Sequence, residues 1–233
     1  MLEIKKGNIF QTTCEALVNP VNCMGVMGKG LAYEFRLRYP DLYQEYKKQC
    51  EKNQIQIGKL WIYKAKDGKV IVNFPTKYHW KYPSKIEYLE KGLKNFVEIY
   101  KQEGITSIAF PVLGSENGKI PLQVALNVMK MYLQNLDLKI EIYIFDKDYP
   151  DDLLPIFKSK FESIGKQELS KGLGLTQNSI YKIRETLKNA KNINNIIDQT
   201  GINRQKFERL FRFIMQRSEG NTLLSPEKEK LPL

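Results

Sequence analysis

The predicted fold is decided by residues 16–30, which read Ala16-Leu17-Val18-Asn19-Pro20-Val21-Asn22-Cys23-Met24-Gly25-Val26-Met27-Gly28-Lys29-Gly30. An apolar, strand-like run leads into a turn with three glycines, and a helical pattern begins where the turn ends. Glycines let a backbone approach a ligand closely, and the start of a helix offers free N–H groups and a positive dipole end. Residues 22–30, which we call the first glycine turn, are therefore predicted to hold a phosphate group.

Two asparagines, Asn19 and Asn22, stand beside this turn. An asparagine side chain can donate to and accept from a ribose hydroxyl without adding charge near phosphates. The alternative is that both asparagines only cap local backbone, because Asn and Gly are ordinary turn residues.

A second glycine turn occupies residues 112–119, which read Val112-Leu113-Gly114-Ser115-Glu116-Asn117-Gly118-Lys119. It also lies between a predicted strand and a predicted helix, and two such turns on neighbouring strands can hold a diphosphate between them. Neither turn has the spacing of a Walker A motif or of the dinucleotide-binding fingerprint. A nucleotide triphosphatase or a dehydrogenase is therefore disfavoured.

A third polar segment reads Asn73-Phe74-Pro75-Thr76-Lys77-Tyr78-His79-Trp80 and follows a strand-like run. A lysine at a strand end beside aromatic residues can be partly desolvated, which lowers its pKa and makes it a candidate nucleophile or acid–base group. His79 is the chain's single histidine, so a hydrogen-bonded structural role is favoured for it and no metal site is expected. Tyr78 and Trp80 could stack on a base or simply pack.

The first part of the chain alternates between strand-like and helical patterns, which predicts an α/β fold with a mainly parallel sheet covered on both faces. The expected strands are residues 2–5, 16–19, 60–64, 70–74, 107–110 and 140–145, and the expected helices are residues 29–38, 42–53, 85–102 and 122–134. In such sheets ligands lie at the carboxyl ends of the strands, where all three polar segments fall.

The rest of the chain is predicted to be helical, with a first domain over 1–148, a small all-α domain over 153–217 and a flexible tail over 218–233. After a short helix at 153–161, apolar positions recur 27 residues apart, and Gly174 recurs as Gly201. Each copy reads helix, Gly-containing turn, helix, which is typical of helix-turn-helix or helix-hairpin-helix units. These units could dock on DNA or protein, or form a plain helical bundle with solvated lysines.

Composition adds weaker constraints. The formal net charge of +11 fits an anionic partner such as nucleic acid, although a merely basic, soluble surface explains it equally well. Three cysteines without metal-ligand spacing favour a reduced, cytoplasmic compartment. We expect no membrane span, no signal peptide and no cofactor.

A family resemblance is carried by ordered motifs over residues 1–146, namely Gly7-Asn8-Ile9, residues 16–22, residues 25–30 and Pro111-Val112-Leu113-Gly114. They resemble the motifs of macrodomains. The first glycine turn together with Asn73–Trp80 resembles the DarG branch, whose members are antitoxins that remove ADP-ribose from thymidine in DNA modified by a DarT toxin. A relative, the terminal ADP-ribose protein glycohydrolase, acts on modified glutamate.

The resemblance implies a three-layer α/β/α macrodomain with a mixed, mainly parallel central sheet, and it implies roles for individual residues. Lys77 matches the catalytic lysine, with Asn22 beside the distal ribose and Asn8 and Ile9 beside the adenine. The diphosphate and distal ribose are expected to be enclosed by Gly25, Val26, Met27, Gly28, Lys29, Gly30, Gly114, Ser115, Glu116, Asn117 and Gly118. Further contacts to the substrate are expected from Asn19 and Thr76.

Two departures from the family pattern are informative. Many macrodomains have Asp where Asn8 stands. The protein-type glycohydrolase has an aspartate in its second loop, whereas this chain reads Ser115-Glu116-Asn117-Gly118 there. The resemblance thus favours a hydrolase of ADP-ribosylated, single-stranded DNA with ADP-ribose as product and a DarT-type toxin as a further partner. The alternatives are a hydrolase of glutamate-linked ADP-ribose on protein and a non-catalytic reader coupled to a DNA-binding domain.

Overall fold

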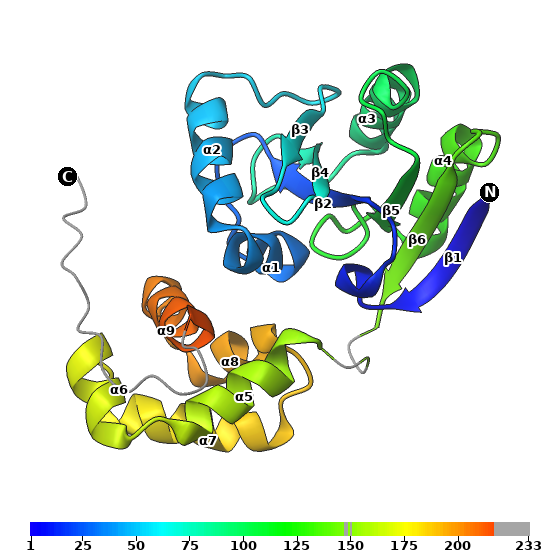
Figure 1. Ribbon diagram of the computed structural model, residues 1–233. Coiled ribbons are helices and arrows are strands. Elements are labelled where there is room, and N and C mark those ends of the chain that lie inside the picture. The colour runs from blue at the N-terminus through cyan, green and yellow to red at the C-terminus, as the bar shows by residue number, and fades with distance from the viewer. Residues whose placement is uncertain (147–148, 150, 217–233) are drawn as a thin grey trace. The chain divides into compact units, whose positions relative to one another are not determined.

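The computed structural model describes residues 1–146, 149 and 151–216 (Figure 1). The chain forms two compact units, Met1–Pro150 and Asp151–Leu233. This division falls within the interval between residues 148 and 153 where the sequence predicts it. The tail predicted at 218–233 lies outside the described residues, as does residue 217. Among the described helices none is both long and apolar enough to cross a membrane.

Within its described residues, the first unit contains one six-stranded sheet in the order β1-β6-β5-β2-β4-β3. All neighbouring strands run parallel except β3, which is antiparallel to β4. The mixed, mainly parallel sheet expected from the sequence is therefore confirmed. The strands are β1 (Leu2–Gly7), β2 (Ala16–Asn22), β3 (Trp61–Lys64), β4 (Val70–Lys77), β5 (Ser107–Pro111) and β6 (Lys139–Phe145).

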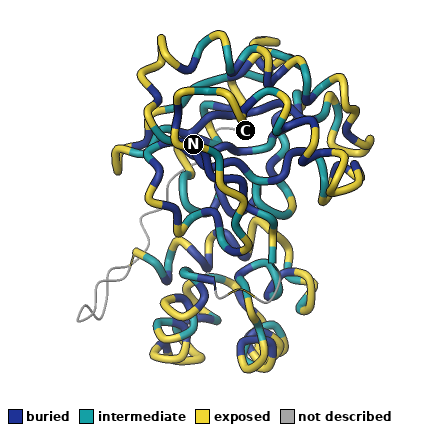
Figure 2. Tube along the Cα trace, turned by 90° about the vertical axis from the view of Figure 1, so that its right-hand side faces the viewer, coloured by how far each residue is buried: buried dark blue, intermediate teal, exposed yellow. Residues whose placement is uncertain are grey.

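Helices cover both faces of this sheet and make the expected three layers (Figure 1). On one face, α3 (Ile86–Ile99) and α4 (Leu122–Leu133) bury residues such as Phe96 and Met129 against the strands. On the other face, α1 (Gly30–Arg38) and α2 (Pro40–Glu51) contribute Phe35 and Leu42 to a second apolar cluster, beside the short 3-10 helix η1 (Ile9–Gln11). Buried residues accordingly follow the central strands, while exposed residues lie on the outer helices (Figure 2).

Two central strands, β2 and β4, run three residues further than the sequence predicts. Their strand-like runs are expected to end at Asn19 and Phe74, but β2 continues to Asn22 and β4 to Lys77, each through a proline. The paired residues of β2 and β5 end at Leu17, and those of β4 and β3 end at Asn73. Pro20 therefore lies beyond the residues of β2 that pair with β5, and Pro75 lies beyond the residues of β4 that pair with β3. On those sides the missing proline N–H interrupts no hydrogen bond between strands.

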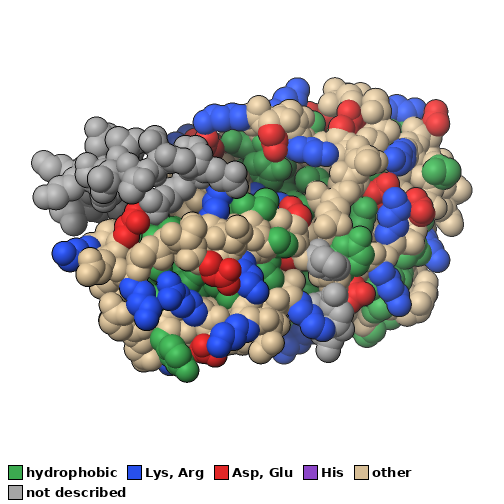
Figure 3. All heavy atoms as spheres, turned by 60° about the horizontal axis from the view of Figure 1, so that its bottom comes forward, with side chains coloured by type: hydrophobic (Ala, Val, Ile, Leu, Met, Phe, Trp, Pro, Cys, Tyr) green, Lys and Arg blue, Asp and Glu red, His purple; other side chains and the backbone are tan. Residues whose placement is uncertain are grey.

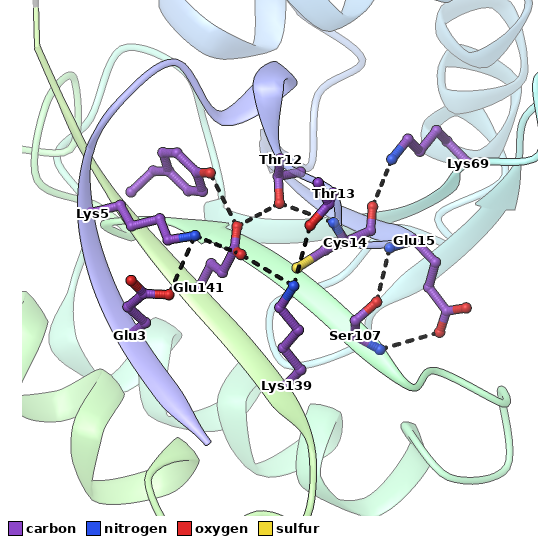
Figure 4. Close-up of polar contacts among 11 residues, drawn as sticks. Glu3, Lys5, Thr12, Thr13, Cys14, Glu15, Lys69, Ser107, Lys139 and Glu141 are labelled. Carbon is purple, nitrogen blue, oxygen red and sulfur yellow. Dashed lines mark hydrogen bonds and ion pairs between the residues drawn. The ribbon is translucent and has the colours of Figure 1, made fainter.

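A buried carboxylate near the start of β6 ties three segments together (Figure 4). Glu141 is 1% exposed, and it accepts hydrogen bonds from Lys5 Nζ (2.7 Å), Thr12 Oγ1 (2.6 Å) and the Tyr143 hydroxyl (3.0 Å). Burial alone would raise the pKa of Glu141, but these three bonds outweigh it and lower the pKa to about 2. The bonds from Lys5 and Thr12 to Glu141 thereby fix β1 and the segment after η1 to strand β6.

The second unit is built from α5 (Leu153–Ser163), α6 (Lys166–Leu173), α7 (Gln177–Asn189), α8 (Ile193–Thr200) and α9 (Arg204–Gln216). Its sequence repeat corresponds to core positions, because the equivalent residues Ile183 and Leu210 are both fully buried. Gly174 and Gly201 end α6 and α8 in the left-handed conformation, which favours glycine. Phe157, Phe207 and their aromatic neighbours form the centre of the unit.

We predict that Glu141→Gln lowers the free energy of unfolding at neutral pH by about 3 kcal/mol, because an amide cannot compensate the charge of Lys5. The wild-type pKa of Glu141, about 2, lies below its ordinary value of about 4.3. The stabilisation is therefore complete above that ordinary value and is lost as the pH falls towards 2. Urea unfolding between pH 7 and pH 3 measures both effects. The exposed Glu98→Gln is the control, and equal stability of both variants would contradict the prediction.

We also predict that Gly92→Ala, in the middle of α3, destabilises the first unit by about 1–3 kcal/mol or more. A Cβ atom there would lie 2.2 Å from Cζ of the buried Phe74, so the helix would have to move off the sheet. The matched control is Gly172→Ala in α6, where nothing lies within 4 Å; alanine should stabilise that helix by about 0.5–1 kcal/mol. Thermal unfolding of both variants measures the difference, and a stabilised Gly92→Ala would contradict it.

Candidate active site

The site is set by the parallel pairing of β2 and β4, which places Asn22 opposite Lys77 at the carboxyl ends of the two strands. The register shifts between Val21 and Asn22, so the last residue of β2 leaves the regular ladder just where the first glycine turn begins. The Cys23 N–H then donates to the carbonyl oxygens of Lys77 (3.2 Å) and Tyr78 (3.0 Å). The first glycine turn is thus fixed to the segment that carries Lys77.

Asn22 organises the first glycine turn through its own side chain. Its Oδ1 accepts from the N–H groups of Met24 (2.9 Å) and Val26 (3.4 Å), while its Nδ2 donates to the Val26 carbonyl. Its backbone carbonyl accepts from the buried hydroxyl of Tyr46 in α2. In this structure Asn22 therefore caps local backbone, one of the two alternatives that the sequence left open, and its contact with a ribose stays a prediction.

Asn19 lies deeper, with a fully buried side chain. Its Nδ2 donates to Asn73 Oδ1 (2.9 Å), and Asn73 in turn donates to the Trp61 carbonyl (3.2 Å). The two amides therefore link β2, β4 and β3. Met27 and Thr76 are also buried. Direct substrate contacts predicted for these residues stay predictions, and the structure gives their side chains packing and hydrogen-bonding roles.

The second glycine turn packs too tightly for side chains at its glycines. A Cβ at Gly118 would lie 2.2 Å from the Gly114 carbonyl oxygen and 2.5 Å from Ser84 Oγ. Gly114 has a φ of 70°, and its carbonyl accepts from the Ile120 N–H at 3.0 Å. Ser115 Oγ donates to the Val112 carbonyl at 2.9 Å. The turn is therefore a compact backbone loop rather than an open one.

The two glycine turns approach each other at Gly30 and Asn117. Gly30 has a φ of 58°, and a Cβ there would lie 2.8 Å from the amide nitrogen of Asn117. Glycine at position 30 thus allows both the left-handed backbone and the close approach of the second turn. The structure brings these two predicted groups of residues together.

Lys77 joins the second turn as well as the first. Its Nζ donates to the Asn117 carbonyl oxygen. Burial lowers the pKa of Lys77 below its ordinary value, and the positive charge of Lys119 lowers it further. A lysine amine that loses its proton more readily is a better nucleophile at neutral pH. Asn22, Lys77 and Asn117 consequently form a single cluster at the carboxyl end of β4.

The remaining predicted residues lie around this cluster or farther along the sheet edge. Lys29 and Glu116 are exposed. Asn8 Oδ1 accepts from the Phe10 N–H at 2.9 Å, and Ile9 belongs to the apolar cluster with Leu17 and Phe35. Both residues follow β1, which β6 and β5 separate from β2 in the sheet. Their predicted place beside an adenine stays a prediction.

Sequence reasoning missed two residues at the site. Lys119 ends the second turn, and the sequence pattern assigns it no role, although its charge lowers the pKa of Lys77 and its φ is 65°. Its position directly after Gly118 was a usable signal. Tyr46 looked like an ordinary apolar position of a helix, and nothing in the sequence indicated its bond to Asn22. In the described part of the chain, no group of three or more His, Cys, Asp or Glu residues could hold a metal ion.

Comparison with known proteins agrees with this geometry. A family model described as Macro domain matches residues 18–129. The macrodomain of Thermus aquaticus DarG has a solved structure that is 41% identical, with a TM-score of 0.58, and the match covers 63% of this chain and 98% of that one. A structure of Thermosipho africanus DarTG in complex with ADP-ribose is 35% identical, with a TM-score of 0.57, over 61% of this chain and 41% of that one.

Among curated proteins, the DNA ADP-ribosyl glycohydrolase of Thermus aquaticus is 41% identical over 149 residues. That match covers 63% of this chain, but this chain spans only 41% of the length of that relative. The similarity is therefore to the macrodomain portion of a longer protein. Because the macrodomain of Thermus aquaticus DarG is covered almost completely at this level of identity, the chain belongs to the macrodomain family.

Proposed function

We propose that this protein is an ADP-ribosyl hydrolase that removes ADP-ribose from modified DNA, with thymidine as the linked base, and thereby reverses a DarT-type modification. The observation that carries the proposal is the placement of Lys77. It ends β4, opposite Asn22, and donates to the second glycine turn with a lowered pKa. The names of the similar proteins from Thermus aquaticus, DNA ADP-ribosyl glycohydrolase and DarG, support the same activity.

The two glycine turns would hold the diphosphate of ADP-ribose. Both follow the carboxyl end of a parallel strand, and α1 begins at Gly30, the last residue of the first turn. Helix N-termini and successive backbone N–H groups bind phosphates well. Asn22 would orient the distal ribose, and Asn8 and Ile9 would lie beside the adenine. The related structure from Thermosipho africanus, which contains ADP-ribose, supports a nucleotide ligand for this site.

The reaction would break the bond between C1″ of the ribose and the ring nitrogen of thymine, through a ribose with oxocarbenium character. The electron pair of that bond leaves with the base, which takes up a proton, and water supplies the hydroxyl of the released ADP-ribose. Lys77 could attack C1″ or protonate the leaving base. Its lowered pKa favours the first role, since only the neutral amine is nucleophilic.

The second glycine turn supports DNA rather than protein as the substrate. The protein-type glycohydrolase that the chain resembles uses an aspartate in this loop, whereas the loop here reads Ser115-Glu116-Asn117-Gly118. Its single carboxylate, on Glu116, is exposed to solvent, and Lys77 instead donates to a neutral carbonyl. Release from a modified glutamate peptide, compared with release from modified DNA, separates the two substrates. Tight ADP-ribose binding without any turnover would indicate a reader instead.

The helical unit would hold the nucleic acid or a partner protein such as a DarT-type toxin. Arg204, Lys206, Arg209 and Arg212 are exposed on α9. On the face shown in Figure 3, however, basic side chains are spread among acidic and apolar ones. This mixture supports contacts to a phosphate backbone at a few points rather than a continuous basic groove. The cytoplasmic compartment expected from the cysteines belongs to the same proposal.

The central prediction is that Lys77→Ala lowers kcat for release of ADP-ribose from modified single-stranded DNA by at least about 1000-fold. Affinity for free ADP-ribose should change little, because the turns that would hold the diphosphate are intact. Single-turnover kinetics and calorimetry measure the two quantities. Unchanged turnover in this variant would rule out the proposed role of Lys77.

Lys77→Arg is the matched control for charge. Arginine keeps the positive charge and the hydrogen-bonding capacity but does not lose its proton in proteins. If the neutral amine is the reactive form, this variant is as inactive as Lys77→Ala, and the wild-type rate rises with pH up to the pKa of Lys77. Substantial activity of Lys77→Arg would mean that a fixed positive charge is sufficient.

For the helical unit we predict that the charge reversal Lys206→Glu with Arg209→Glu weakens binding of unmodified DNA. It should also reduce the slope of log K against log salt by about 0.7–0.9 for each lost phosphate contact. The control is Lys94→Glu with Lys101→Glu in the first unit, which makes the same change in net charge at exposed positions. Equal effects of the two double variants would show that α9 has no specific role.

A further inference from the structure

The segment after Lys77 exposes aromatic side chains that the proposed hydrolase chemistry does not use. We call residues 78–83, Tyr78-His79-Trp80-Lys81-Tyr82-Pro83, the aromatic loop. Tyr78 is 63% exposed, Trp80 47% and Tyr82 66%. Large aromatic side chains are usually buried when they only stabilise a fold, so several of them on one exposed loop indicate a binding surface.

The aromatic loop is fixed at both ends to the two glycine turns. At its start, the Tyr78 carbonyl accepts from the Cys23 N–H at 3.0 Å. At its end, the buried Ser84 donates its N–H to the Gly118 carbonyl at 2.9 Å. The loop therefore lies directly beside both glycine turns. A nucleic-acid strand attached to a nucleotide held by these turns would pass close to the loop.

The rings of the loop are arranged for stacking. His79 lies between the other two rings, at 5.5 Å from Trp80 with an interplanar angle of 24° and at 5.4 Å from Tyr82 with an angle of 49°. His79 Nδ1 accepts from the Lys81 N–H at 3.2 Å, and its carbonyl accepts from the Tyr82 N–H at 3.2 Å. The half-buried histidine thus supports Trp80 and Tyr82, which keep much of their surface in solvent.

The aromatic loop and the residues that flank it in the sequence carry only positive charge. Residues 75–86 contain Lys77, Lys81 and Lys85 and no acidic residue. Lys81 Nζ lies 5.2 Å from the centre of the Trp80 ring, and both Lys81 and Lys85 are exposed. Flat aromatic rings interleaved with lysines match a chain of bases joined by phosphates. Within a duplex the bases are stacked on each other, so their faces are accessible only in a single strand.

We infer that the aromatic loop binds the single-stranded nucleic acid next to the modified nucleotide. Bases adjacent to that nucleotide stack on Trp80 and Tyr82, and Lys81 and Lys85 contact the phosphates between them. Trp80 and Tyr82 are then specificity-determining residues, because they recognise a strand and not an isolated nucleoside. The inference rests on the proposed function, to which it adds the residues that bind the strand beside the modified nucleotide.

The first experiment compares two substrates in the full chain, an ADP-ribosylated single-stranded oligonucleotide and ADP-ribosyl-thymidine as a nucleoside. Removing the aromatic side chain in Trp80→Ala should lower the ratio of kcat/KM for oligonucleotide to nucleoside by about 10- to 100-fold. Trp80→Phe, which keeps a ring, should restore most of that ratio. The control Met131→Ala removes an exposed apolar side chain from α4 (71% exposed) and should leave the ratio unchanged.

A second experiment reads stacking without catalysis. The chain has two tryptophans, and Trp61 is partly buried in β3, so the emission of Trp80 is obtained by subtracting that of Trp80→Phe. Unmodified oligothymidylate should quench Trp80 emission, and replacement of Lys81 and Lys85 by Gln should weaken this binding and its salt dependence.

The outcomes separate the inference from the proposed function. If the wild-type protein releases ADP-ribose from neither substrate, the proposed function fails, while quenching still decides whether the loop binds a strand. If Trp80→Ala lowers turnover of both substrates equally, or if oligothymidylate does not quench Trp80, the inference is wrong. It is also wrong if the variant selectively impairs release from a modified peptide, because the loop would then bind protein.

Discussion

The pairing of β2 with β4 beyond their prolines is the constraint on which the site depends. It places Asn22 opposite Lys77, so that one strand end supplies the first glycine turn and the other supplies a lysine whose pKa is lowered. A strand that ended at Asn19, the end expected from the sequence, would leave Asn22 and Lys77 on separate loops with no defined distance between them. The bond from the Cys23 N–H to the Lys77 carbonyl continues the ladder one residue further and locks this arrangement.

The two glycine turns at the site pack through their backbone, and side chains beside them hold that backbone in place. Asn19 and Asn73 bond to each other inside the sheet, Asn22 folds the first glycine turn onto itself, and Tyr46 anchors it from α2. Such a site presents N–H groups in fixed directions, which costs less conformational entropy on binding than ordering long side chains. It also explains why the residues that resemble the family motif are glycines and small amides.

Much of this could be predicted from the sequence, and the failures have physical causes. The helix at 122–133 and the strand over 107–111 agree closely with the expected ranges of 122–134 and 107–110, because both segments are strongly apolar and carry a proline at one boundary. The ends of β2 and β4 could not be predicted, since they depend on where β5 and β3 stop. Lys119 and Tyr46 act through distances between segments far apart in the chain, which no local pattern encodes.

Two lysines of the first unit show how the fold assigns chemical roles to identical side chains. Lys5 donates to the buried carboxylate of Glu141, and this bond raises the pKa of Lys5 well above its ordinary value. Lys77 donates to the neutral carbonyl of Asn117, while burial and the charge of Lys119 lower its pKa. A carboxylate partner would hold Lys77 in its charged form and remove its nucleophilicity. The absence of an aspartate from residues 114–118 is therefore compatible with a reactive lysine, because the amine needs a partner that accepts a hydrogen bond without stabilising the positive charge.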